Sequence, residues 1–255
     1  MNRVITALLL APVALYLIFV AQPMVLLVAA ALVASLCFWE YCGLAARHGL
    51  HCALPVGCAA GVLGFLIPPA EWRLLLVLTT LAVLLIQSRY ANLSAVLPST
   101  GALVLGILYV YAPWHYSLPL RERSAHWLFF ALATGWIGDI AAYYTGTRLG
   151  RHRLAPRISP NKTWEGTLAS LAAATLFAVV YLKATLDLSW TVGLPLGVVT
   201  NIAAQFGDLA ESALKRGAGV KDSGSWLPGH GGWLDRLDTT LFTLPLVYLY
   251  VSRWY

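Results

Sequence analysis

Long apolar runs alternate with short polar or Pro/Gly-rich breaks along almost the whole chain. A helix needs about 20 apolar residues to cross the hydrocarbon layer of a bilayer. The spacing of the runs therefore predicts an all-α, polytopic transmembrane protein with about nine membrane helices. The predicted helices span residues 4–21, 24–45, 52–68, 72–87, 93–111, 126–145, 165–183, 190–214 and 238–251.

Composition supports this fold class. Of 255 residues, 59% are hydrophobic and 11% are charged, whereas a soluble domain has about 25% charged residues. The repetition of apolar runs at membrane-spanning length excludes a soluble protein with a large core. Four cysteines lie in the first quarter of the chain without zinc-type spacing, and we expect them to be apolar packing residues: Cys37, Cys42, Cys52 and Cys58.

The distribution of Lys and Arg predicts the orientation of the helices. With the N-terminus in the cytoplasm, twelve of the 17 basic residues fall in cytoplasmic segments and five on the far side. This asymmetry follows the positive-inside rule. The net charge of +6 is therefore partly a topology signal, and no nucleic-acid-binding motif accompanies it. We expect membrane lipids, and no nucleic acid, as partners.

Ionisable groups divide the chain into two regions. Glu40 and Glu71 are the only acids before residue 119, each near a predicted helix end. We interpret residues 1–119 as a transmembrane scaffold region. Residues 120–255 form a second transmembrane region that carries the chemistry, with its site on the cytoplasmic side.

A polar stripe follows the eighth predicted helix, which ends in GDLAESALKR. Asp208, Glu211, Ser212 and Lys215 are spaced i, i+3, i+4 and i+7, which places them on one helical face. Polar residues on a membrane helix usually face a cavity or a partner. The alternative is a structural ion network, in which the acids pair with Lys215 or Arg216.

The stripe leads into the glycine-rich segment KRGAGVKDSGSWLPGHGGWLDRLD. Its glycines, among them Gly231 and Gly232, let the backbone approach a ligand, and successive free N–H groups can cradle phosphate oxygens. His230 is expected to donate a hydrogen bond to phosphate. A flexible, soluble connector is the alternative. Positive charge around the segment comes from Lys215, Arg216, Lys221 and Arg236.

Three acids predict a metal site. Asp235 and Asp238 open the last helix, and Asp208 ends the eighth. Clustered carboxylates with phosphate oxygens suit Mg²⁺, a hard ion that prefers oxygen. Capping of the last helix is the alternative role for Asp235 and Asp238.

Two further segments carry polar groups near the cytoplasmic face. Asp139, inside the sixth predicted helix, is costly there without a positive or metal partner. In SPNKTWEG, Lys162 can meet an anionic headgroup, and Asn161 can donate a hydrogen bond. Carboxylates, a glycine loop and basic residues at a membrane surface favour phosphoryl or nucleotidyl transfer.

These motifs resemble a known family. The run from Ser212 to Asp238, SALKRGAGVKDSGSWLPGHGGWLDRLD, closely resembles the signature of the phosphatidate cytidylyltransferases, or CDP-diacylglycerol synthases. The segments DIAAYY, ISPNKTWEG and GDLAES resemble the family too. The resemblance covers about residues 136–238, and the first 120 residues resemble the family only in being hydrophobic.

The resemblance implies an integral-membrane enzyme of the bacterial inner membrane that joins CTP to phosphatidic acid, giving CDP-diacylglycerol and pyrophosphate. It implies Mg²⁺, a monovalent cation such as K⁺, and a homodimer. It implies that Asp208, Asp235 and Asp238 bind the metal. Asp208, Lys215, Asp235 and Arg236 would be catalytic. Residues that contact CTP or phosphatidate would be Asp139, Ser159, Asn161, Lys162, Glu211, Arg216, Lys221, Asp222, His230, Gly231 and Gly232.

Other functions compete with this one. A lipid or polyprenol kinase using CTP or another NTP needs the same kind of site, but it releases a nucleoside diphosphate and not pyrophosphate. A transporter or lipid carrier would place its charges near the bilayer midplane, whereas here they gather at one face. A CDP-alcohol phosphotransferase would need a DGxxAR pattern, which the chain lacks.

Overall fold

The computed structural model describes residues 2–68, 71–89, 92–227, 229 and 231–255, with side chains from residue 8 onward. The described chain forms two compact units. The first unit contains Met1–Leu118 and Leu214–Arg236, and the second contains Pro119–Ala213 and Leu237–Tyr255. The first unit therefore includes the glycine-rich segment as far as Arg236. The division after residue 119 that the sequence predicts concerns function and not compactness, and it stays a prediction.

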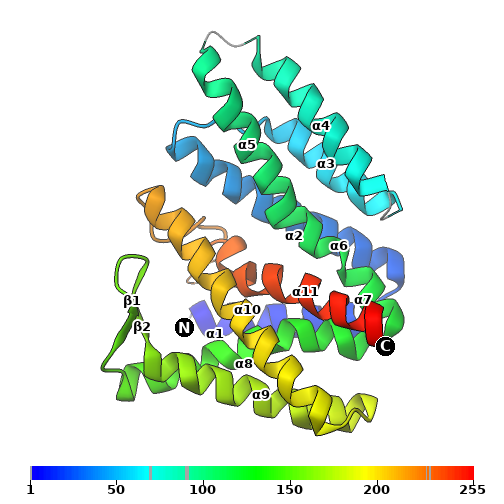
Figure 1. Cartoon of the computed structure of the whole chain (residues 1–255), viewed down its shortest axis with the longest axis vertical. Helices are drawn as coiled ribbons and strands as arrows, with labels where there is room; N and C mark the ends of the chain where they lie inside the picture. The colour runs from blue at the N-terminus through cyan, green and yellow to red at the C-terminus, as the bar shows by residue number, and fades with distance from the viewer. Residues whose placement is uncertain (1, 69–70, 90–91, 228, 230) are drawn as a thin grey trace. The chain divides into compact units, whose positions relative to one another are not determined.

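Helices dominate both units (Figure 1). In chain order the α-helices are α1 (Asn2–Phe19), α2 (Pro23–Arg47), α3 (Leu54–Leu66), α4 (Trp72–Gln87), α5 (Val96–Gly106), α6 (Ala112–His115), α7 (Ser117–Arg123), α8 (Ala125–Leu149), α9 (Trp164–Leu186), α10 (Trp190–Gly217) and α11 (Leu234–Trp254). A short 3₁₀ turn, Leu93–Ala95, precedes α5, and a π-helical turn, Ile107–Tyr111, follows it. The all-α prediction holds for the described residues apart from one hairpin, β1 (Arg153–Ala155) with β2 (Ser159–Thr163).

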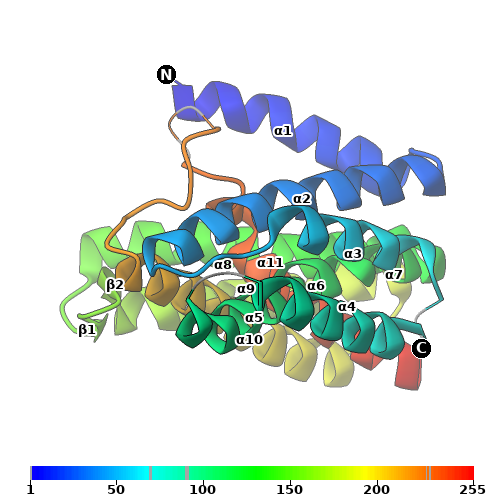
Figure 2. The ribbon, with the colours of Figure 1, turned by 90° about the horizontal axis from the view of Figure 1, so that it is seen from above.

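Close helix packing in the first unit depends on glycine. Helix α3 packs against α2 and α4, and α5 packs against α4 (Figure 2). A Cβ atom at Gly57 would lie 2.4 Å from the Phe38 ring, and one at Gly61 would lie 2.3 Å from the Tyr111 ring. Both rings are fully buried. Small residues thus let helix backbones approach, as is usual in membrane proteins.

The second unit packs by the same rule. Helices α8 and α9 lie against each other along their lengths. Helix α9 buries small residues such as Ala174 and Ala178, and a Cβ atom at Gly197 of α10 would lie 2.6 Å from the Ala178 methyl. On its other side α9 exposes Leu168, Leu176 and others. The helix therefore has a small-residue packing face and a large apolar outer face.

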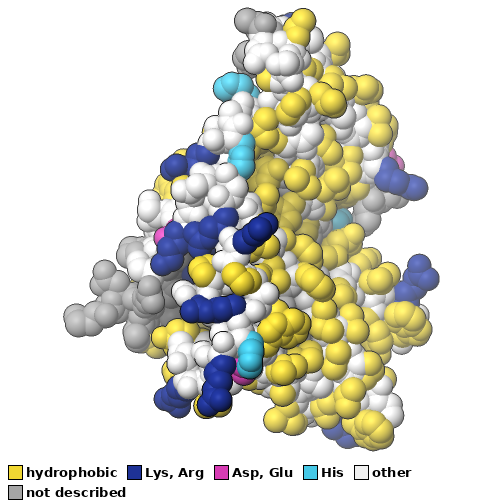
Figure 3. Space-filling view, turned by 60° about the vertical axis from the view of Figure 1, so that its left-hand side comes forward, with side chains coloured by type: hydrophobic (Ala, Val, Ile, Leu, Met, Phe, Trp, Pro, Cys, Tyr) yellow, Lys and Arg dark blue, Asp and Glu magenta, His cyan; other side chains and the backbone are white. Residues whose placement is uncertain are grey.

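Exposed apolar side chains identify a membrane protein. In the first unit, α4 exposes a row of large aliphatic residues, and hydrophobic side chains cover much of the surface drawn in Figure 3. Water-soluble monomers rarely expose contiguous apolar patches of this kind. By length and composition, three helical segments among the described residues can cross a bilayer: Pro23–Arg47, Leu93–Arg123 and Trp164–Leu186.

The structure corrects one predicted break. The sequence placed a loop between residues 111 and 126, but most of it is helical, in α6 and α7. Pro113 lies in the first turn of α6, directly after the π-helical turn Ile107–Tyr111. Arg121 and Arg123 lie in the last turn of α7, where positive charge complements the helix dipole.

Candidate active site

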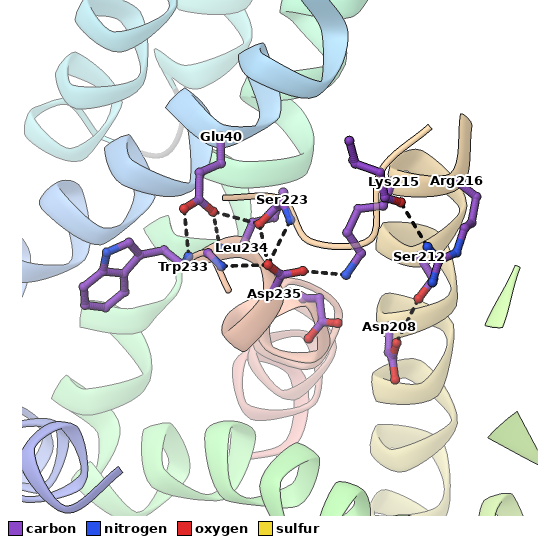
Figure 4. A network of polar contacts seen from close by, with 12 residues as sticks. Glu40, Asp208, Ser212, Lys215, Arg216, Ser223, Trp233, Leu234 and Asp235 are labelled. Atoms are coloured by element: carbon purple, nitrogen blue, oxygen red, sulfur yellow. Dashed lines mark hydrogen bonds and ion pairs between the residues drawn. The ribbon is translucent and has the colours of Figure 1, made fainter. Parts of the chain in front are cut away.

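The first polar centre is a hydrogen-bonded network in the first unit, shown in Figure 4. Its central group is Asp235, in the first turn of α11, whose side chain is 3% exposed. Oδ1 of Asp235 lies 2.5 Å from Nζ of Lys215, near the end of α10. Oδ2 accepts hydrogen bonds from the backbone N–H of Gly232 at 2.7 Å and of Ser223 at 2.9 Å. Asp235 thus joins the end of α10 to two points of the glycine-rich segment, Ser223 and Gly232.

Two opposing effects act on the pKa of Asp235. Burial raises it, because the charged form loses hydration, whereas the ion pair with Lys215 and the hydrogen bonds from Gly232 and Ser223 lower it. The partners prevail, and the pKa lies below its usual value. Asp235 is therefore a carboxylate at neutral pH, and it neutralises Lys215 at the base of the segment.

The same network includes Glu40 of α2, which the sequence assigned to the scaffold. Its carboxylate accepts hydrogen bonds from the backbone N–H of Trp233 at 3.0 Å and of Leu234 at 2.8 Å, and from the hydroxyl of Ser223 at 2.9 Å. We call Glu40, Lys215, Ser223, Gly232, Trp233, Leu234 and Asp235 the loop network. Glu40 could have been suspected as a lone acid in an apolar helix.

The second polar centre is an acid cluster in the second unit. The carboxylate of Asp238, in α11, interacts electrostatically with those of Asp208 and Glu211 in α10 and of Asp139 in α8. Glu211 is fully buried and Asp238 is 7% exposed. We call these four residues the acid cluster. Among the described residues, no three His, Cys, Asp or Glu side chains are arranged to hold a metal ion.

The β-hairpin supplies a cation to the acid cluster. Lys162 of β2 forms an ion pair with Asp208, and the hydroxyl of Ser212 donates to Asp208 at 3.3 Å. Ser159 and Asn161 lie on the same strand. Glu165, in the first turn of α9, accepts hydrogen bonds from the backbone N–H groups of Arg151 and His152, whereas Thr163 caps the helix. The structure thus brings Lys162 together with Asp208, one of the predicted metal-binding acids.

The remaining predicted residues belong to the glycine-rich segment. Gly231 has a φ of 81°, which favours glycine, and Arg216 donates to the carbonyl of Val220 at 3.0 Å. The prediction for His230 lies outside the described residues. The exposed members of the predicted set are Arg216, Lys221, Asp222 and Arg236 in this segment, and Asp139 and Asn161 outside it.

The carboxylates of the acid cluster are the ligand type that a divalent cation such as Mg²⁺ prefers, although no three of them are arranged to hold a metal ion among the described residues. Like charges repel, so the gathering of four carboxyl groups from three helices favours either a bound cation or a protonated member of the cluster. Lys162 provides one positive charge. Asp235 is less suited to bind a metal ion, because Lys215, Ser223 and Gly232 already donate to its carboxylate oxygens. A metal ion bound to Asp235 would have to displace some of them.

Fold and site together describe an apolar, helical membrane protein with a basic glycine-rich loop and clustered carboxylates. Comparison with known proteins places it in a family. The sequence model of the Cytidylyltransferase family matches residues 1–254, so the chain belongs to this family.

Curated relatives agree with this placement. The chain is 38% identical over 156 residues to the phosphatidate cytidylyltransferase of Bacillus subtilis, covering 60% of this chain and 58% of the relative. It is 38% identical over 163 residues to that of Thermotoga maritima, covering 61% and 60%. A third relative, from Staphylococcus aureus, is 39% identical over 146 residues, covering 56% of each. The matches span about three-fifths of the length of these relatives.

The buried ion pair predicts how Asp235 affects stability. Replacing Asp235 by Asn leaves Lys215 without its charged partner, and we expect a loss on the order of 2–3 kcal/mol at pH 7. Because the folded-state pKa of Asp235 is lowered, its stabilisation is complete above the ordinary Asp pKa of about 3.9 and disappears as pH falls through the folded value. Unfolding of the purified protein in detergent, followed from pH 8 to pH 3, measures this difference.

Asp187→Asn is the matched control. Asp187 also pairs with a lysine, Lys183, but this pair is exposed, and Asn tolerates the positive φ of position 187. We expect little change in stability for the control at any pH. Equal effects of the two substitutions at pH 7, or an Asp235→Asn effect that persists unchanged at pH 3, would contradict the assignment.

Proposed function

We propose that the protein is a phosphatidate cytidylyltransferase, which converts CTP and phosphatidic acid to CDP-diacylglycerol and pyrophosphate in phospholipid biosynthesis. The observation that carries this proposal is the family match over residues 1–254, with curated relatives named for this activity. The two polar centres support it, because nucleotidyl transfer needs positioned cations and carboxylates more than a protein nucleophile.

In this proposal the glycine-rich segment binds the nucleotide. Lys215 is fixed by Asp235, so its charge is held beside the loop. Arg216, Lys221 and Arg236 add positive charge, and Gly231 and Gly232 allow the backbone to approach phosphate oxygens. Asp222 and His230 complete the proposed nucleotide contacts. Positive charge here would stabilise pyrophosphate as it departs.

The β-hairpin and the acid cluster serve the lipid phosphate and the metal. Lys162 would attract the phosphate of phosphatidic acid, with Ser159 and Asn161 as hydrogen-bond donors, beside Asp139 and Glu211. A phosphate oxygen of phosphatidic acid then attacks the α-phosphorus of CTP, and the bond to the β-phosphate oxygen breaks. Asp208 and Asp238 would hold Mg²⁺, with Asp235 as the third predicted ligand. When bound, Mg²⁺ would neutralise negative charge on the phosphates.

The proposal also covers the membrane location and the oligomeric state of the protein. The apolar runs support about nine crossings of a bacterial inner membrane, and the positive-inside distribution supports an orientation with the N-terminus and the site in the cytoplasm. K⁺ beside Mg²⁺ and a homodimer follow from the resemblance alone. Activity with and without K⁺, and the molar mass of the protein in detergent, test these two points.

The reaction products test the proposed function. Purified protein in vesicles containing phosphatidic acid, given CTP and Mg²⁺, should release pyrophosphate and CDP-diacylglycerol in equal amounts. Vesicles with diacylglycerol in place of phosphatidic acid are the control and should give neither product. Release of CDP with a phosphorylated lipid would identify a lipid kinase instead. Absence of pyrophosphate, while a known cytidylyltransferase is active in the same vesicles, would refute the proposal.

A substitution at Asp238 tests the metal site because it should affect thermal stability and turnover in different directions. Asp238→Asn keeps the acceptor for the Thr239 N–H and removes one charge from the acid cluster. We therefore expect a melting temperature in EDTA no lower than that of the wild type, but at least about 100-fold slower turnover. The rise in melting temperature on adding Mg²⁺ should also shrink. Near-normal turnover at saturating Mg²⁺, with Asp187→Asn as the control, would rule out the metal role.

Cysteine labelling tests the orientation. In a background without the four native cysteines, Ser225→Cys places a thiol of similar size in the exposed glycine-rich segment. Glu122→Cys places one in α7 without removing a basic residue that contributes to topology. An impermeant reagent added outside intact cells should label position 122 and not 225. The reverse pattern would overturn the proposed orientation.

A further inference from the structure

Glu40 is a buried carboxylate in a region with little other charge. It lies in α2, is 5% exposed, and is surrounded along the helix by buried apolar residues such as Phe38 and Tyr41. Burying a carboxylate in such surroundings costs several kcal/mol unless strong donors meet it. The position therefore requires an explanation that packing alone does not provide.

The donors come from the glycine-rich segment. Two are backbone N–H groups at the start of α11, those of Trp233 and Leu234, and the third is the hydroxyl of Ser223. The first N–H groups of a helix have no intrahelical partner, and the helix dipole favours negative charge there. Glu40 thus fixes the point at which the segment becomes helix.

Two glycines provide the space that the carboxylate occupies. A Cβ atom at Gly224 would lie 2.4 Å from Oε1 of Glu40, and one at Gly232 would lie 2.3 Å from Oε2. Neither glycine has a positive φ, so backbone conformation does not require them. The close approach of the Glu40 carboxylate requires glycine at these two positions instead. Part of the glycine content of the segment is therefore matched to one side chain of α2.

Ser223 connects Glu40 to Asp235. Its hydroxyl oxygen lies 2.9 Å from Oε2 of Glu40 and 3.0 Å from Oδ2 of Asp235. Asp235 in turn holds Lys215. The chain of contacts from Glu40 through Ser223 and Asp235 to Lys215 is continuous within the first unit (Figure 4). Displacing Glu40 would therefore disturb the orientation of the Lys215 ammonium.

An aromatic contact ties the same helix to the same segment. The rings of Trp39 and Trp226 meet edge to face with centroids 5.0 Å apart. This contact is independent of the carboxylate. Two successive residues of α2 thus contact the segment, one through a charge and one through a ring.

We propose that Glu40 is a positioning residue for the nucleotide-binding loop. It contacts no substrate in this proposal, but it holds Ser223 and the start of α11 so that Asp235 keeps Lys215 in place. The catalytic part of the inference depends on the proposed function. The structural part, that Glu40 orders residues 222–227 and 231–235, does not.

The first test replaces Glu40 by Gln. The amide keeps the size but has one acceptor oxygen where three donors converge. At a temperature where the protein stays folded, kcat/KM for CTP should fall at least about tenfold, with less change in KM for phosphatidic acid. Hydrogen exchange should accelerate in peptides covering residues 222–227 and 231–235. Glu71→Gln, at an exposed acid of the same region, should match the wild type in both measurements.

The second test uses the space around the carboxylate, and it remains informative if Glu40→Gln folds poorly. Gly224→Ala should slow turnover and loosen the segment, because its methyl group collides with Glu40. In a Glu40→Ala background the same substitution should have little further effect, since the collision is gone. Gly101→Ala, where a Cβ atom meets nothing within 4 Å, is the control.

The outcomes separate this inference from the proposed function. Equal exchange in Glu40→Gln and wild type, or the same Gly224→Ala penalty in both backgrounds, would overturn the positioning role. A global rise in exchange with a lower melting temperature and unchanged kcat/KM would overturn it too, because it indicates a merely structural residue. A wild type without cytidylyltransferase activity would refute the proposed function, and the exchange measurements would still decide whether Glu40 orders the segment.

Discussion

A carboxylate can be buried in an apolar helical protein only where donors or cations surround it, because its lost hydration costs several kcal/mol. This constraint explains both polar centres. Asp235 is held by Lys215 and two backbone N–H groups, and Glu40 by three donors of the glycine-rich segment. In the acid cluster, Lys162 meets Asp208, and the remaining negative charge makes a cation-binding role chemically reasonable.

The apolar runs predicted the long helices well, because the length of a run sets the bounds of such a helix. The predicted helix 72–87 coincides with α4, and the first two predicted helices differ from α1 and α2 by two residues or fewer at each end. The runs did not predict α6, α7 or the β-hairpin. In these short segments the backbone conformation depends on local groups, such as Pro113 and the pairing of Arg153 with Thr163, which a hydrophobic pattern does not register.

Several residues of the candidate site were singled out from the sequence, but the ion pairs between them were not. Helical spacing placed Asp208, Glu211 and Lys215 on one face, and the signature drew attention to Asp235. The sequence could not show that Asp235 pairs with Lys215 while Asp208 pairs with Lys162. Spacing rules describe neighbours within one element, whereas these ion pairs join different elements.

The glycines of the segment also show what spacing rules within the sequence do not reveal. In sequence, the glycines at 224, 229, 231 and 232 look equivalent, each a position where the backbone is free. In the structure, Gly229 and Gly231 have positive φ, which favours glycine, whereas Gly224 and Gly232 lack Cβ atoms where the Glu40 carboxylate lies. Conformation and space are separate physical reasons for one residue type. The second reason depends on a residue more than 180 positions away, and so it becomes visible only when α2 and the segment are seen together.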